Sequence, residues 1–134
     1  MDGVTLTPLR QILNPKGDIF HAIKKSDQGF AGFGEAYFST VYNGVIKGWK
    51  KHTKMTLNLV VPSGVIEFVC FDGKEFQSIV LSQDNYQRLT VNPGVWVAFR
   101  GKNEGLNLLL NVASIEHDPA ESENCSLEDI SYDW

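Results

Sequence analysis

The sequence is poor in cysteine and has no long hydrophobic run. Its two cysteines, Cys70 and Cys125, are too few for a disulfide framework, and Cys70 lies in a strand-like apolar run where a buried thiol is expected. No stretch approaches the roughly 18 consecutive apolar residues that a transmembrane helix requires. Residues 1–3 show neither the basic start nor the apolar segment of a signal peptide. We therefore expect a cytoplasmic protein that does not associate with a membrane.

Positive charge is also in short supply. The 12 lysines and arginines are outnumbered by 16 aspartates and glutamates, for a net charge of −4, which argues against nucleic acid as a partner. One basic cluster stands out within this acidic chain: Lys47, Lys50, Lys51 and Lys54. Local positive charge in an acidic protein favours the capture of a small anionic group over the binding of a polyanion.

Short runs rich in Val, Ile, Phe and Tyr alternate with turn residues along most of the chain. The acidic tail from about residue 119 is the one part expected to hold a helical turn. Ten strands are predicted, near residues 4–12, 18–24, 35–42, 45–52, 56–61, 65–71, 75–81, 87–91, 95–100 and 106–114. Short strands without helical crossovers indicate one all-β domain spanning residues 1–134, folded as an antiparallel sandwich or barrel.

Two of the predicted strands are apolar on both faces, at residues 57–61 and 106–110. A sheet face in contact with water carries more polar residues than these strands do. Two explanations remain open at this point. A second subunit covers part of the sheet, or these strands lie at the centre of a well-covered sheet.

Residues 44–64 are the most informative part of the sequence. The Asn43-Gly44 turn opens a strand in which Lys50, His52 and Lys54 alternate and so share one face. Two ammonium groups and an imidazole are poor material for a hydrophobic core. They are suitable for lining a pocket that receives an anion.

The spacing of residues 44–64 resembles the first motif of the cupin barrels, in which a glycine is followed by two histidines, a glutamate and a second glycine. Both glycines are kept, but Lys50 and Leu57 stand at the first-histidine and glutamate positions, and only His52 remains. Val97 stands at the histidine position of the second cupin motif. Ammonium and aliphatic groups cannot bind a metal ion. The resemblance implies a cupin-type antiparallel jelly-roll β-barrel, and the replaced residues predict that it needs neither metal nor cofactor.

Within the cupins, the sequence is most similar to the deoxysugar-modifying enzymes. The segment Lys47-Gly48-Trp49-Lys50-Lys51-His52-Thr53-Lys54 resembles Arg-Gly-Phe-His-Ala-His-Lys-Lys of the dTDP-4-keto-6-deoxyglucose 3,4-ketoisomerases. Gly44-Val45-Ile46-Lys47-Gly48-Trp49-Lys50 resembles Gly-Val-Leu-Arg-Gly-Leu-His of the dTDP-4-dehydrorhamnose 3,5-epimerases. Three flanking stretches also resemble the epimerases: Gly17-Asp18-Ile19-Phe20, Leu81-Ser82-Gln83-Asp84-Asn85 and Ile130-Ser131-Tyr132-Asp133-Trp134. The likeness covers most of residues 17–134.

This resemblance implies an epimerase or isomerase of a nucleotide-linked, dTDP-type 4-keto-6-deoxysugar in surface polysaccharide synthesis. Such enzymes move a proton next to a ketone, and a histidine suits the base because its unperturbed pKa is about 6.5. His52 matches the second histidine of the ketoisomerase pair, which makes it the candidate base. Lys50, at the position of the epimerase base, is implied to contact the diphosphate or the ketone, or to act as a base if desolvated. Lys47 matches an arginine that contacts phosphate, and the other substrate-binding candidates are Lys54, Glu35, Tyr37 and Ser39.

Some of the family's functional residues are replaced. The epimerases' lysine falls on Leu57, and their acid tyrosine falls near Leu110. The alternative function is therefore a catalytically inactive cupin that binds a sugar nucleotide or serves as an assembly partner. At the level of single residues, a structural histidine is the alternative for His52, a solvated surface lysine for Lys50 and a core tyrosine for Tyr37.

A homodimer is expected as well. Residues 4–9 are apolar, extended and close to the N-terminus, which suits them to extend the sheet edge of a partner subunit. The family to which the sequence is similar also dimerises through such strands.

Overall fold

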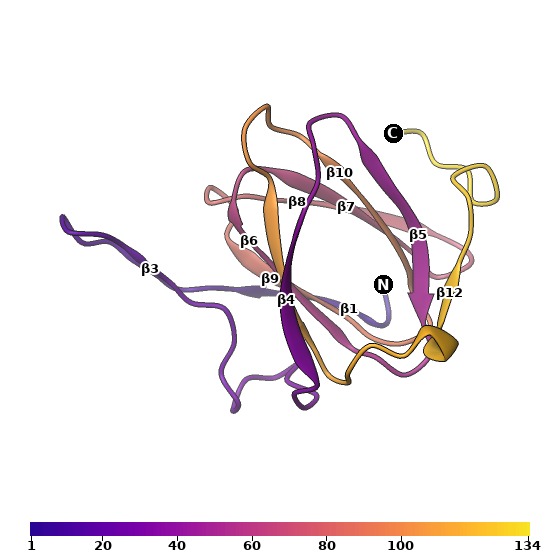
Figure 1. Ribbon diagram of the computed structural model, residues 1–134, viewed down its shortest axis with the longest axis horizontal. Coiled ribbons are helices and arrows are strands. Elements are labelled where there is room, and N and C mark those ends of the chain that lie inside the picture. Colours follow the sequence, from indigo (N-terminus) through magenta and orange to yellow (C-terminus); the bar gives the residue numbers. More distant parts are fainter.

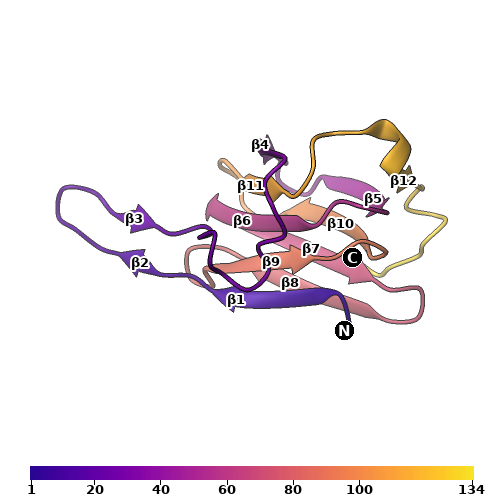
Figure 2. The same cartoon turned by 90° about the horizontal axis from the view of Figure 1, so that it is seen from below.

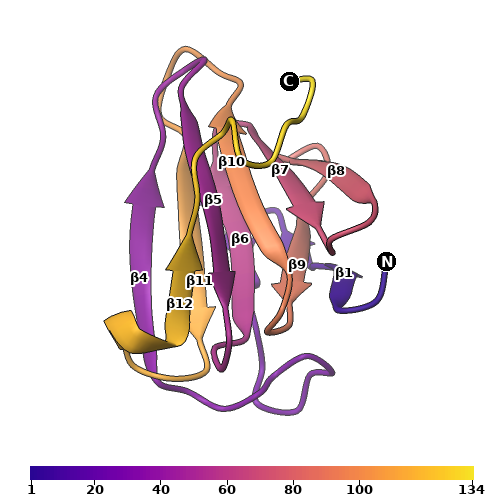
Figure 3. The ribbon, with the colours of Figure 1, turned by 90° about the vertical axis from the view of Figure 1, so that its right-hand side faces the viewer.

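The computed structural model describes residues 1–134 as two five-stranded antiparallel sheets and one projecting hairpin (Figures 1 and 3). The first sheet, in spatial order, consists of β1 (Val4–Pro8), β9 (Gln87–Val91), β6 (Leu57–Ser63), β11 (Leu108–Ala113) and β4 (Glu35–Thr40). The second consists of β12 (Ser122–Asn124), β5 (Ile46–His52), β10 (Trp96–Gly101), β7 (Ile66–Phe71) and β8 (Phe76–Leu81). The hairpin pairs β2 (Gln11–Ile12) with β3 (Ile19–Phe20), and one 3₁₀ turn, η1 (Pro119–Glu121), precedes β12.

The predicted all-β jelly-roll is confirmed, and most predicted strands lie within a few residues of the observed ones. The helical turn expected in the tail is η1. Two predicted strands had wrong boundaries. The strand predicted at residues 4–12 is divided into β1 and β2 after Pro8, because proline lacks the N–H that would continue the hydrogen-bond ladder. The strand predicted at residues 18–24 ends at Phe20. The strand β12 was not predicted, because its sequence Ser-Glu-Asn has no strand-forming preference and pairs with β5 only in the folded chain.

The main hydrophobic core lies between the two sheets. Sixteen buried residues form it, with Leu57, Leu59 and Val61 of β6 facing Ile66, Phe68 and Cys70 of β7 and their neighbours. Burial raises the pKa of the Cys70 thiol to about 12, so this cysteine behaves as a core residue. Alternate residues of each strand therefore meet in one layer, as expected for two packed sheets.

The outer face of β6 is covered by the chain itself. β6 is the central strand of its sheet, and side chains of β6 and its neighbour β9 bind the backbone of residues 22–29. The Asn58 side chain donates to the Gly29 carbonyl at 3.0 Å, and the fully buried Arg88 donates to the carbonyls of Ala22 at 2.9 Å and Gln28 at 3.1 Å. Of the two explanations for the apolar residues 57–61, the well-covered central strand is the one that the structure supports.

The hairpin formed by β2 and β3 projects away from both sheets (Figures 1 and 2). Its apolar residues are open to solvent, with Leu13 75% and Ile19 56% exposed. β1, at its base, pairs with β9 of the same chain and forms an edge of the first sheet, and the homodimer remains a prediction. None of the helical segments has the length and apolar character required to cross a bilayer.

Candidate active site

A cavity of about 340 Å³ opens between the two sheets. Its wall from β4, β5 and β11 is largely polar, whereas β6 and β10 supply mainly apolar side chains. The lining residues are Tyr37, Ser39, Lys47, Gly48, Lys50, His52, Leu57, Leu59, Val97, Phe99, Leu109 and Asn111. The cavity thus combines an apolar floor with cationic and hydrogen-bonding groups, which is the usual composition of a small-molecule site.

An irregularity in the pairing of β5 brings two lysines to this cavity. Val97 of β10 is opposite Lys50, but Phe99 is opposite Lys47, so three residues of β5 face two of β10. A β-bulge of this kind redirects side chains, and here it places Lys47 and Lys50 on the same face although their spacing is odd. Lys47 Nζ donates to Ser39 Oγ at 3.2 Å and lies 5.8 Å from the centre of the Phe99 ring. The Lys50 ammonium has no ion pair within the chain.

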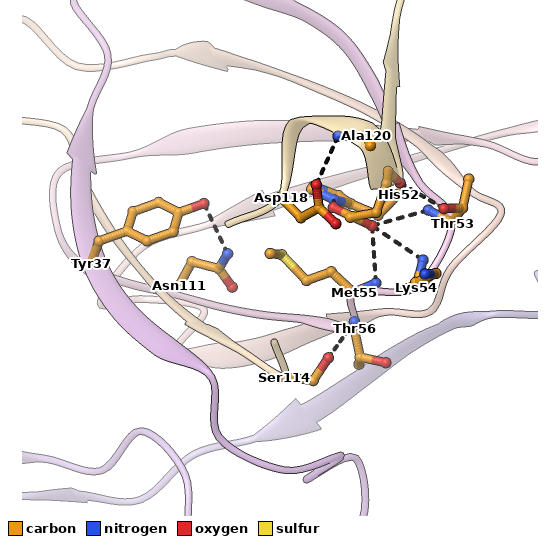
Figure 4. Close-up of polar contacts among 11 residues, drawn as sticks. Tyr37, His52, Thr53, Lys54, Met55, Thr56, Asn111, Ser114, Asp118 and Ala120 are labelled. Atoms are coloured by element: carbon orange, nitrogen blue, oxygen red, sulfur yellow. Dashed lines mark hydrogen bonds and ion pairs between the residues drawn. The ribbon is translucent and has the colours of Figure 1, made fainter. Parts of the chain in front are cut away.

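His52 is held by a carboxylate from the C-terminal part of the chain (Figure 4). Its Nδ1 is hydrogen-bonded to Glu121 Oε1, and the two side chains are only 11% and 2% exposed. The other oxygen, Oε2, accepts from the backbone N–H groups of Thr53, Lys54 and Met55 at 3.2, 3.1 and 3.2 Å. The turn after β5 therefore forms a three-donor cradle for one carboxylate.

The environment of Glu121 fixes the tautomer of His52. Burial by itself raises the pKa of Glu121, but the hydrogen bonds from His52 and from the backbone of Lys54 and Met55 outweigh it, and the pKa lies below the ordinary 4.5. An ionised carboxylate only accepts hydrogen bonds, so the neutral imidazole carries its proton on Nδ1. Nε2 is left with its lone pair free, which is the form in which a histidine can accept a proton from a ligand.

Tyr37 is oriented by a second polar contact, with its partner Asn111 on the neighbouring strand β11 (Figure 4). Asn111 Nδ2 donates to the Tyr37 hydroxyl oxygen at 3.0 Å, and Asn111 Oδ1 accepts from the backbone N–H of Asn58 at 3.2 Å. Because the asparagine is the donor, the Tyr37 O–H hydrogen is available for another acceptor. Tyr37 is largely exposed, so it is not the core residue that the sequence left open.

Comparison with known proteins shows the family to which the chain belongs. Residues 2–124 match the family model described as "FdtA: WxcM-like, C-terminal". The chain belongs to this family. It is 33% identical to a dTDP sugar isomerase from Desulfovibrio desulfuricans G20, whose crystal structure it matches with a TM-score of 0.94 over 99% of this chain and 91% of the other.

Two further comparisons are more distant. QdtA, a sugar 3,4-ketoisomerase from Thermoanaerobacterium thermosaccharolyticum solved in complex with TDP, has the same fold at 24% identity, with a TM-score of 0.81 over 92% of this chain and 88% of that one. The spore coat polysaccharide biosynthesis protein SpsL of Bacillus subtilis is 22% identical over 145 residues, which cover 100% of this chain and 96% of SpsL.

In this FdtA-like chain, five of the seven site residues proposed from the sequence line the cavity: Tyr37, Ser39, Lys47, Lys50 and His52. Lys54 and Glu35 lie outside its lining. The alternation of β5 ends at His52, and the Lys54 side chain is exposed in the following turn, where only its backbone serves the site. Glu35 begins β4 opposite Ala113, beyond the cavity.

The positions expected to carry cupin metal ligands do converge in space. Lys50, His52, Leu57 and Val97 all line the one cavity, and they offer a single imidazole to an ion. No group of three or more histidine, cysteine or acidic side chains is placed to hold a metal. Metal-binding residues of the kind the cupin frame would require are therefore not present at this site.

Sequence reasoning missed Glu121 and Asn111. Glu121 lies 69 residues from His52 in an acidic tail, and nothing in its surroundings distinguishes it from other surface carboxylates. The tyrosine position of the epimerases was placed near Leu110, whose side chain faces away from the cavity while Leu109 and Asn111 face into it. The run of apolar residues in β11 could have drawn attention to Asn111 as its one polar member.

Proposed function

We propose that the protein isomerises a nucleotide-linked, dTDP-type 4-keto-6-deoxysugar by moving a proton next to the ketone, in the synthesis of a surface polysaccharide. The observation that carries this proposal is the His52–Glu121 pair, which presents a basic Nε2 at a cavity that also holds two lysines. Structural histidines also pair with buried carboxylates, so the pair supports catalysis through where it lies. Its location at a lined cavity supports a catalytic role over the structural alternative.

The relatives support the substrate class. The 33% identical Desulfovibrio protein is a dTDP sugar isomerase, and a variant of QdtA has been solved in complex with TDP-4-keto-6-deoxyglucose. SpsL and the Haloferax volcanii protein Agl13 are named for polysaccharide and glycan biosynthesis. The Desulfovibrio protein is named an isomerase and Agl13 a probable epimerase, so we base the choice of isomerisation on His52, which matches the second histidine of the ketoisomerases.

The two lysines suit the charged part of such a substrate. We assign Lys47 to the diphosphate, because Ser39 and the Phe99 ring hold its ammonium at the cavity wall. Lys50, unpaired and nearby on the same face, is assigned to the diphosphate or to the ketone oxygen. The aliphatic floor of Leu57, Leu59 and Leu109 is suited to the methyl group and C–H faces of a deoxysugar.

The chemical step follows from these positions. His52 Nε2 takes the proton from the carbon beside the ketone, and the electron pair of that C–H bond moves toward the ketone oxygen. Glu121 stabilises the imidazolium that forms. The Tyr37 hydroxyl and the Lys50 ammonium stabilise the enolate oxygen, Tyr37 as the hydrogen-bond donor that Asn111 leaves available. The imidazolium then returns the proton to the former ketone carbon, while the hydroxyl on the deprotonated carbon gives its proton to the former ketone oxygen. The C=O bond thus re-forms one carbon along, which completes the isomerisation.

Product analysis tests this proposal. The purified protein is incubated with dTDP-4-keto-6-deoxyglucose, and the sugar is followed by proton NMR. We expect signals of a 3-keto isomer to replace those of the substrate. If calorimetry shows binding while the substrate stays unchanged, the protein is instead a sugar-nucleotide binding cupin without catalytic activity.

We further propose that the chain acts as a homodimer in the cytoplasm. The projecting hairpin exposes Leu13 and Ile19, and these apolar side chains have no partner within the chain. Light scattering measures the mass directly.

A further inference from the structure

The strand that carries His52 is buried on its outer face as well. Trp49 of β5 points away from the cavity and is only 1% exposed. Val69 and Ala98 of the same sheet form its base, and the rings of Phe71 and Phe76 lie 6.5 and 6.2 Å from its own. A second small core thus lies directly behind the candidate active site.

The C-terminal segment closes this second core. We call residues 125–134 the C-terminal strap, and Figure 3 shows it passing in front of β10. The Cys125 N–H donates to the Trp49 carbonyl at 3.2 Å, and the Trp49 indole N–H donates to the Ile130 carbonyl at 3.0 Å. The ring of Trp134 lies 6.3 Å from that of Trp49, and the Arg100 guanidinium lies 5.6 Å from the centre of the Trp134 ring. The strap is therefore fastened to the catalytic strand at both of its ends.

The strap is continuous with the residue that orients His52. Between Glu121 and Cys125 there is only β12, whose three residues pair with β5 from His52 to Lys50. An edge strand of three residues has too few hydrogen bonds to hold its position alone. The burial of aromatic side chains by the strap supplies the additional stabilisation that β12 needs.

We propose that the C-terminal strap is a positioning element, which holds Glu121 against His52 by docking on Trp49. Opening of the strap releases β12 and lets the Glu121 carboxylate leave its backbone cradle. The imidazole then loses the acceptor that keeps its proton on Nδ1. Trp49, Ile130 and Trp134 thereby act on the site through Glu121 and contact no substrate themselves. The effect on turnover rests on the proposed function, but the effect on His52 does not.

The two cysteines provide a measurement of strap opening that needs no substrate. Cys125 lies in the strap, whereas Cys70 is fully buried in the main core and reports global unfolding. Native-state labelling with a thiol reagent is compared in the natural sequence and in two variants, Trp49→Phe and Trp134→Ala. Glu128→Ala is the matched control, because Glu128 belongs to the strap, is exposed and is not part of the second core.

Trp49→Phe removes the indole N–H donor and also reduces the buried ring from two fused rings to one. We expect Cys125 to react at least roughly 2- to 10-fold faster, the effect of the lost hydrogen bond alone. Trp134→Ala should accelerate it further, while Cys70 stays protected and Glu128→Ala behaves like the natural sequence. Nitrogen-15 NMR of the imidazoles should show His52 moving from the Nδ1–H tautomer to a mixture, with His52→Asn used to assign its signals.

If turnover is found, kcat should fall about 10- to 100-fold with little change in KM, as for loss of a group that orients a catalytic histidine. In a protein that already carries Glu121→Gln, Trp49→Phe and Trp134→Ala should lower kcat little further. Faster Cys125 labelling with an unchanged His52 tautomer would overturn the proposal, as would simultaneous labelling of both cysteines. Absence of turnover alongside the expected labelling and NMR changes would count against the proposed function and leave the strap's role standing.

Discussion

Replacing Glu121 by glutamine changes the candidate site at a single group. The glutamine side chain keeps an oxygen for the N–H groups of Thr53, Lys54 and Met55, but it then turns its NH₂ group toward His52. The imidazole must accept that hydrogen bond on Nδ1, so its proton moves to Nε2, and the nitrogen at the cavity can no longer act as a base. We expect kcat to fall by about 10²- to 10⁴-fold. The upper value is the loss of kcat seen when the orienting carboxylate of a catalytic triad is replaced by an amide.

The same substitution should lower the free energy of unfolding by about 1–3 kcal/mol, because a buried ionised acceptor of four hydrogen bonds becomes neutral. Glu123→Gln is the matched control. Glu123 lies two residues further along, and its ion pair with Lys51, although only 3.0 Å long, leaves the carboxylate 56% exposed. Its loss should cost at most about 1 kcal/mol and leave kcat unchanged. Equal effects of the two substitutions on kcat would refute the role assigned to Glu121.

The pH dependence of stability gives a second readout of Glu121→Gln. The folded-state pKa of Glu121 is lowered, so its contribution is fully present above the unfolded value near 4.5 and is lost as the pH falls through the folded value. The stability difference between the two proteins, measured by denaturant unfolding, should therefore shrink below about pH 4.5. The pKa values of Asp27 and Asp72 are also lowered, chiefly by hydrogen bonds from the backbone N–H groups of Lys24 and Glu75 respectively. Both carboxylates are present in the natural sequence and in Glu121→Gln, so their contributions cancel in the stability difference between the two proteins.

Three further outcomes are expected. Lys47→Ala should weaken nucleotide-sugar binding by about 1–3 kcal/mol in calorimetry, the scale of a lost charge-assisted hydrogen bond. Lys51→Ala is the control and should bind normally, because Lys51 lies outside the cavity. Normal binding by Lys47→Ala would show that Lys47 does not bind the phosphate. Chelator treatment should leave the Tm unchanged. A stoichiometric, tightly bound metal in the purified protein would contradict the prediction that Lys50, Leu57 and Val97 leave the site without metal ligands. Light scattering should report a dimer at micromolar concentration, and a mass of about 15.0 kDa would rule it out.

The fold was largely predictable because its signals are local. Turn residues such as Asn43-Gly44 fix where strands end: Gly44 has a φ of +76°, which favours glycine, and the Val45 N–H closes the turn on Tyr42 at 3.1 Å. The alternation of Lys50 and His52 likewise follows from strand geometry alone. The weaker parts were the ends of the chain, where β12 exists only because β5 offers it an edge.

The candidate site was predictable only where one strand carries it. Lys47 shares the cavity with Lys50 because of a bulge for which the residues of β5 give no separate signal. Lys54 was included by extending the alternation past His52, where the strand has already ended. Glu121 comes from a distant segment and was out of reach, since its contact with His52, 69 residues earlier, forms only in the folded chain.

Deuterium incorporation tests the central claim most directly. The protein is incubated with dTDP-4-keto-6-deoxyglucose in deuterated water, alongside His52→Asn, which keeps a side chain of similar size that can hydrogen-bond. The account predicts deuterium at the carbon beside the ketone with the natural sequence, and a rate about 10²- to 10⁴-fold lower in a folded His52→Asn variant. Exchange at the full rate in that variant, or no exchange by either protein despite binding, would contradict it.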